Sequence, residues 1–128
     1  MPLASFEASA QGTKAVKDFK SKPATAEDSF TYSFMGTYVL CRALQLGIEF
    51  PKAIQLGGGV YATIIKDKHE GKLASAGGKV LTDKQILDGA ASQVIMRAGV
   101  MCPKELPKEI LADVNKNMER MKKQMEIK

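Results

Sequence analysis

The sequence predicts a mostly α protein, a compact bundle of four to five helices. For residues 51–80 it allows two structures, a short helix or a hairpin. Apolar residues recur at helical spacing in two segments near the C-terminus, which places each set on one helix face. The first set comprises Ile86, Leu87, Ala90, Ala91, Val94 and Ile95, and the second comprises Leu106, Ile110, Val114, Met118, Met121 and Met125. The chain of 128 residues is 45% apolar and 26% charged, which is typical of one globular domain. Each apolar face needs a packing partner, so the two faces together indicate a bundle.

The N-terminal segment differs in composition from the rest. Residues 1–26 are rich in Ala, Ser, Thr and Lys, and we expect them to form a mobile basic arm. Within this arm a short helix is expected around residues 13–20, with Val16 and Phe19 on its apolar side. Residues 27–128 are expected to form a single helical domain.

A central helix is predicted over residues 27–46. Glu27 and Asp28 lie at its start, where acidic side chains favour the positive end of the helix dipole, and Gly47 is suited to its end. Its broad apolar surface comprises Phe30, Phe34, Met35, Tyr38, Val39, Cys41, Leu44 and Leu46. Gly36 costs up to ~1 kcal/mol relative to alanine, and close helix contact or chance explains it equally well.

Residues 51–80 contain the glycine triplet 57–59, which we interpret as a break. The favoured structure is a short helix over 51–56 followed by a second helical element over 60–68. Because residues 60–65 also have strand propensity, a hairpin with residues 72–81 is the alternative. We favour the helix, since residues 74–78 are mostly Ala and Gly and make a poor strand.

Two further helices are predicted, over residues 82–98 and 106–124, both packed on the central helix. Thr82 and Gln85 have the spacing of a capping box, and Gly99 is suited to the end of the first of these helices. The last helix has acids near its start and bases near its end, which complements its dipole.

The chain has 19 Lys and Arg against 14 Asp and Glu, a formal net charge of +5. This charge permits an acidic partner, but solubility explains it as simply. Neither a secretory signal nor an apolar run long enough to cross a bilayer is visible. We therefore expect a soluble protein of the cytoplasm or another intracellular compartment.

The two cysteines, Cys41 and Cys102, lie among apolar neighbours, so two buried thiols are the favoured interpretation. A disulfide between them requires that the fold bring them together.

No residue pattern indicates catalysis. His69, the one histidine, lies in a polar run and is expected on the surface. A general base needs a positioned partner, and none is evident. Neither a phosphate-binding glycine pattern nor metal-ligand spacing is complete. We expect a protein that is not an enzyme, with no cofactor and no metal.

The predicted function is that of a small non-enzymatic interaction, assembly or adaptor protein. It would use the basic arm and the Met-lined last helix to bind a protein partner, or a second copy as a homodimer. The candidate partner-binding residues are Met118, Met121, Lys122 and Met125.

Two alternatives stay open. One is a helix-turn-helix DNA-binding protein formed by residues 52–68. Its candidate nucleic-acid contacts are Tyr61, Thr63, Lys66 and Lys68. The other is a helical ligand-binding protein, with a pocket lined by Phe34, Tyr38, Tyr61 and Ile64.

Overall fold

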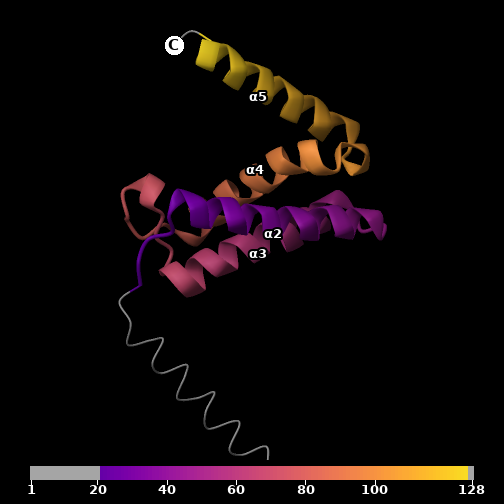
Figure 1. Cartoon of the computed structure of the whole chain (residues 1–128). Coiled ribbons are helices and arrows are strands. Elements are labelled where there is room, and N and C mark those ends of the chain that lie inside the picture. Colours follow the sequence, from indigo (N-terminus) through magenta and orange to yellow (C-terminus); the bar gives the residue numbers. More distant parts are fainter. Residues whose placement is uncertain (1–20, 127–128) are drawn as a thin grey trace, which may run out of the picture.

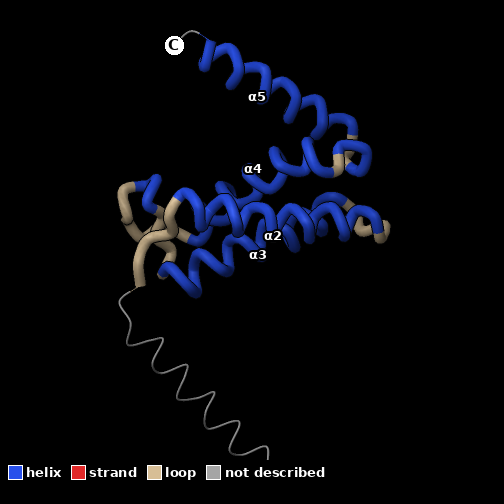
Figure 2. Tube along the Cα trace, in the orientation of Figure 1, coloured by secondary structure: helices blue, strands red, loops and turns tan. Residues whose placement is uncertain are grey.

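A computed structural model describes residues 21–126 and confirms the predicted all-α bundle (Figures 1 and 2). Its α-helices are α2 (Ala26–Gln45), α3 (Phe50–His69), α4 (Asp83–Met101) and α5 (Lys108–Glu126). Two short 3₁₀ turns, η1 (Ala74–Ala76) and η2 (Pro103–Glu105), lie in the connections before α4 and α5. Helices α2, α3 and α4 pack against one another, and α5 extends away from them beyond α4 (Figure 1). The predicted short helix over residues 13–20 lies outside the described residues.

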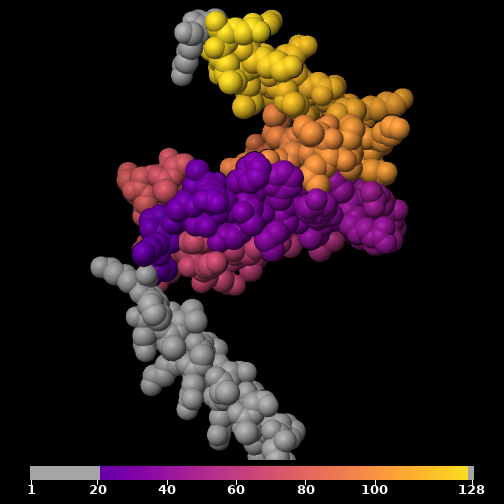
Figure 3. Space-filling view, viewed as in Figure 1, coloured from indigo at the N-terminus to yellow at the C-terminus, as the bar shows by residue number. Residues whose placement is uncertain are grey.

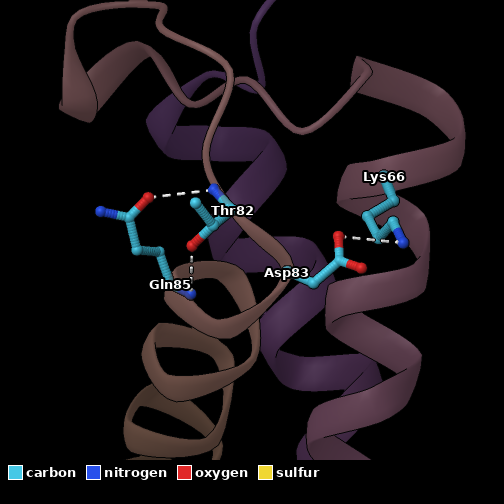
Figure 4. A network of polar contacts seen from close by, with 4 residues as sticks. All are labelled: Lys66, Thr82, Asp83 and Gln85. Carbon is cyan, nitrogen blue, oxygen red and sulfur yellow. Dashed lines mark hydrogen bonds and ion pairs between the residues drawn. The ribbon is translucent and has the colours of Figure 1, made fainter.

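The starts of α2 and α4 are fixed by capping boxes. At α4 the Gln85 backbone N–H donates to the Thr82 hydroxyl at 3.1 Å, and the Thr82 N–H donates to the Gln85 side chain at 3.0 Å (Figure 4). At α2 the Thr25 N–H and the Asp28 carboxylate form the equivalent pair at 3.0 Å. These contacts satisfy N–H groups that have no partner within the helix. The predicted starts of both helices are therefore confirmed to within one residue.

The predicted break at the glycine triplet is wrong, because α3 is one continuous helix from Phe50 to His69. A Cβ atom on Gly57 would lie 2.5 Å from the Gly36 carbonyl oxygen of α2 and 3.0 Å from the Leu40 Cβ atom. A Cβ atom on Gly58 would lie 3.4 Å from the Ala91 Cα atom of α4. The glycines let three helix backbones approach closely, and this packing offsets their low helix propensity of about 1 kcal/mol each.

The hairpin alternative is also wrong. The residues just before α2 also pack against the bundle. After α3 the chain turns through Glu70 and Gly71, both with positive φ, and forms only isolated bridges. One bridge joins Leu73 to Ala24, which is almost fully buried. Residues 22–26, placed in the arm by the sequence, are therefore packed against the fold.

His69 was expected on the surface but is buried, at 6% exposure. Its Nδ1 atom lies 2.7 Å from the Lys22 carbonyl oxygen, and its Nε2 atom lies 2.8 Å from the Tyr32 hydroxyl. A carbonyl oxygen can only accept, so in the neutral ring Nδ1 donates to it and Nε2 accepts from the hydroxyl. Both ring nitrogens are satisfied, which gives His69 a structural role in holding the N-terminal segment on α3.

Cys41 and Cys102 form a disulfide, with their Cα atoms 6.0 Å apart. The prediction that both side chains are buried is confirmed, whereas the prediction of free thiols is wrong. Helices α2 and α4 run in the same direction, each antiparallel to α3, so their C-terminal ends bring residues 61 positions apart to the same end of the bundle (Figure 1). Local sequence carries no information about that meeting.

The last helix does not pack as predicted. Its apolar residues contact α4, and α2 is not among its main packing partners. Gly99 is expected to end α4 but lies within it. A Cβ atom on Gly99 would lie 2.5 Å from the Val114 Cγ1 atom of α5. The glycine thus marks the crossing point of the two helices.

Candidate protein-interaction surface

The amphipathic helix α5 leaves the C-terminal part of its apolar face uncovered. Within Lys108–Glu126, Val114 is the only buried side chain. Met118 is half-buried, while Met121 and Met125 are 56% and 76% exposed. Lys122 is exposed beside them. The four residues predicted from the sequence to bind a partner are thus accessible along the C-terminal half of one helix.

A groove of about 400 Å³ separates this half of α5 from α4. Because α5 contacts α4 near the connection and then diverges, its C-terminal half stands off the bundle (Figure 3). The groove is lined by Ser92, Gln93, Met96, Arg97, Val100, Met118 and Met121. Thioether side chains adapt to differently shaped apolar surfaces, so such a lining suits a macromolecular contact.

Arg97 lies where this groove meets α2. Its guanidinium carbon is 4.2 Å from the ring centre of Phe30 and 4.7 Å from that of Phe34, within the range of cation–π attraction. Its Nε–H donates to the Ser33 hydroxyl. Among residues 21–126 no carboxylate lies within ion-pair distance of Arg97. The guanidinium is therefore held in place while its terminal N–H groups keep their capacity to donate.

The groove has a positive character. No Asp or Glu is among its described lining residues, and Arg97 contributes a permanent positive charge. A second groove between the same two helices shares Ser92 and Met96 with the first but includes Asp88 and Asp113. The two sides of the α4–α5 contact therefore differ in charge.

The residues proposed to contact nucleic acid do not form a helix-turn-helix. Because α3 is continuous through residues 52–68, the two-helix geometry of that motif is absent there. Tyr61 is buried, and its hydroxyl donates to the Gln93 side chain at 3.2 Å. Thr63, Lys66 and Lys68 are exposed, and Lys66 forms an ion pair with Asp83 at 3.0 Å (Figure 4).

The four residues expected to line a ligand pocket are not gathered around one cavity. Tyr38 is 63% exposed on α2, whereas Tyr61 is buried between α3 and its neighbours. Ile64 lines a shallow apolar groove on α3 together with Leu56 and Val60.

No candidate metal centre is found in the described part of the chain, where His, Cys, Asp and Glu do not gather in groups of three. None of the helices over residues 21–126 is long and apolar enough to cross a membrane.

Sequence reasoning missed the role of Arg97. The spacing of Phe30 and Phe34 predicts core packing on the central helix. Phe30 is in fact 51% exposed, and the two rings form the base on which Arg97 rests. Only the packing of α4 on α2 brings residues 30 and 97 together.

The fold and this surface define an all-α bundle protein whose amphipathic C-terminal helix is covered only in part. The chain belongs to the family described as a domain of unknown function (DUF8650), whose family model matches residues 27–128. Searches of curated proteins and of solved structures find no match.

Proposed function

We propose that this protein is a non-enzymatic interaction protein that binds a protein partner along α5 and the adjacent groove of α4. The observation that carries the proposal is the uncovered half of the α5 stripe, in particular Met121 and Met125. Moving a methionine side chain from water into an apolar contact is worth about 1.5–3 kcal/mol when complete. Burial of these two side chains by a partner therefore favours binding by several kcal/mol.

The form of α5 supports this function. Its described residues 108–126 make a regular helix with Glu109 in the first turn and Lys123 in the last, an arrangement that complements the dipole and favours the helix where its C-terminal half is not buried. An amphipathic helix presented beside a groove is a recurrent mode of protein recognition. The flexible methionine side chains adjust to the shape of the partner.

Site-specific photo-crosslinking in the native host tests the proposal. A photoreactive amino acid replaces Met121 in one variant and Lys116, which is exposed but lines neither groove, in the matched control. We expect one discrete adduct from position 121 and none from position 116. The protein in that adduct should bind the purified chain directly, at least tenfold more weakly after Met121→Glu. Identical adduct patterns at the two positions, or none at either, would contradict the proposed function.

A further inference from the structure

We infer that the groove between α4 and α5 receives an amphipathic helix of an acidic partner, whose carboxylate pairs with Arg97 while its apolar side chains contact the methionines. This inference rests on the proposed function and specifies the chemistry of the partner. Three features of the groove carry it: its apolar lining, the fixed position of Arg97, and the distribution of charge around it.

The lining is suited to an apolar helix face. Met96 and Val100 line the groove from α4, while Met118 and Met121 line it from α5. Residues one helical turn apart thus lie on each of two diverging helices, as expected of a groove that accepts a third helix. The exposed Met125 extends the same stripe toward the open end.

Arg97 is arranged to bind a carboxylate. The two phenylalanine rings and the Ser33 hydroxyl already restrict its side chain, so little conformational entropy is left to lose on binding. Its planar guanidinium can donate two parallel hydrogen bonds to one carboxylate. A bound helix would also exclude water from the pair, which makes it stronger than an exposed pair such as Lys84 with Asp88.

The charge distribution favours an acidic partner over a second copy of this chain. Within residues 21–126 no acidic side chain lines the groove, and Lys122 lies beside Met121 on α5. The chain as a whole carries +5, so a second copy would bring the same excess of positive charge.

The sequence of α5 also opposes its pairing with a second α5. The a and d positions of a heptad are occupied by Leu111, Val114, Met118, Met121 and Met125. The flanking e positions are then Lys108, Asn115 and Lys122. In an antiparallel pair e faces e, which would place lysine opposite lysine. Such pairing is disfavoured, whereas Asp or Glu on a partner helix would complement the same positions.

The test uses the full chain and matched synthetic helices. The peptides are stapled helices of about 18 residues with apolar side chains at i, i+3, i+4 and i+7. One set carries Glu and the other carries Lys at the flanking positions. Fluorescence anisotropy measures each Kd, and NMR of ¹³C-methyl-labelled methionine locates the contact. We expect the acidic set to bind at least tenfold more tightly than the basic set, with shifts at Met96, Met118 and Met121.

Variants separate the guanidinium from general charge. Arg97→Gln should weaken binding of the acidic peptide about tenfold, the loss expected of one charge-assisted hydrogen bond. Arg97→Lys keeps the charge but not the two parallel donors, so an intermediate loss is expected. Lys116→Gln removes the same charge from the far side of α5 and should change Kd less than twofold. Circular dichroism melts of all three variants confirm that the fold is retained.

The outcomes distinguish this inference from the proposed function. Equal binding of the two peptide sets, no binding of the acidic set, or an unchanged Kd for Arg97→Gln would overturn the inference. A dimer in sedimentation that Met121→Glu dissociates would also overturn it, because a second copy would then occupy the groove. If position 121 still cross-links specifically to a protein in any of these cases, the proposed function survives and only the acidic helix is wrong.

Discussion

The close contact between α2 and α3 gives a sharp test of the packing. A Cβ atom on Gly57 would lie 2.5 Å from the Gly36 carbonyl oxygen, whereas a Cβ atom on Gly59 would meet nothing within 4 Å. Both glycines lie in α3 with helical backbone, so alanine has the same intrinsic effect at each. Gly57→Ala and Gly59→Ala are therefore a matched pair that differs only in the space around the new methyl group.

The magnitudes follow from two opposing effects. Replacement of glycine by alanine inside a helix gains about 0.8–1 kcal/mol. Gly59→Ala should show this gain alone and raise the free energy of unfolding. At Gly57 the methyl group must push α2 and α3 apart, because the atom it meets is backbone. Overpacking of this kind costs about 1–3 kcal/mol, and the rigid contact here places it at the upper end. Gly57→Ala should then be about 2 kcal/mol less stable than the parent protein.

Urea denaturation followed by circular dichroism at 222 nm measures both effects, and thermal melts provide a second readout. The two variants should differ by about 3 kcal/mol, or roughly 12 °C in Tm at about 4 °C per kcal/mol for a domain of this size. Gly89→Ala is the second control, because a Cβ atom on Gly89, which lies in α4, would also meet nothing within 4 Å. This variant should also be more stable than the parent protein. A Gly57→Ala variant as stable as the parent would refute the close approach of α2 and α3. A destabilised Gly59→Ala variant would refute the continuous helix.

Three further predictions concern the covalent link, the buried histidine and the start of α2. The disulfide between Cys41 and Cys102 joins residues that are 61 positions apart. Its reduction, or Cys102→Ser, should therefore lower the free energy of unfolding by about 4 kcal/mol, because the unfolded chain gains the entropy of the opened loop. Thiol titration and melts with and without reductant measure this loss. Tyr32→Phe removes the hydroxyl that donates to buried His69 and should cost about 1–3 kcal/mol in urea denaturation, so an unchanged midpoint would contradict the assigned hydrogen bond. The backbone N–H of the N-cap residue lowers the pKa of Asp28 below its ordinary value, so its stabilising effect is present above the unfolded pKa and is lost as pH falls through the folded pKa. The Tm difference between the parent and Asp28→Asn should accordingly shrink on acidification from pH 7 to pH 3, and a constant difference would contradict the carboxylate's role.

The apolar face of α5 was predictable from the sequence, but how much of that face stays exposed was not. Spacing alone placed Met118, Met121 and Met125 on one face, and that face exists. Spacing cannot say whether a face is covered from within the chain. Coverage depends on the angle at which α5 leaves α4 beyond the close contact between Gly99 and Val114. The anchor formed by Arg97 and two phenylalanines was not predictable, because it joins residues that are distant along the chain.

The sequence by itself determined the helical class, the starts of α2 and α4, and the apolar face of α5. Helix periodicity and capping depend on residues within one or two turns, so a single sequence contains them in full. Tertiary structure alone decided that α3 runs unbroken through its glycine triplet, that Cys41 and Cys102 meet, and that His69 is buried. In each case a contact with a distant segment outweighs the local preference. The close packing that the glycines of α3 allow stabilises the fold by more than their low helix propensity destabilises it. Cys41 bonds to a cysteine that is distant in sequence, and the polar ring of His69 is buried because both of its nitrogens have hydrogen-bond partners.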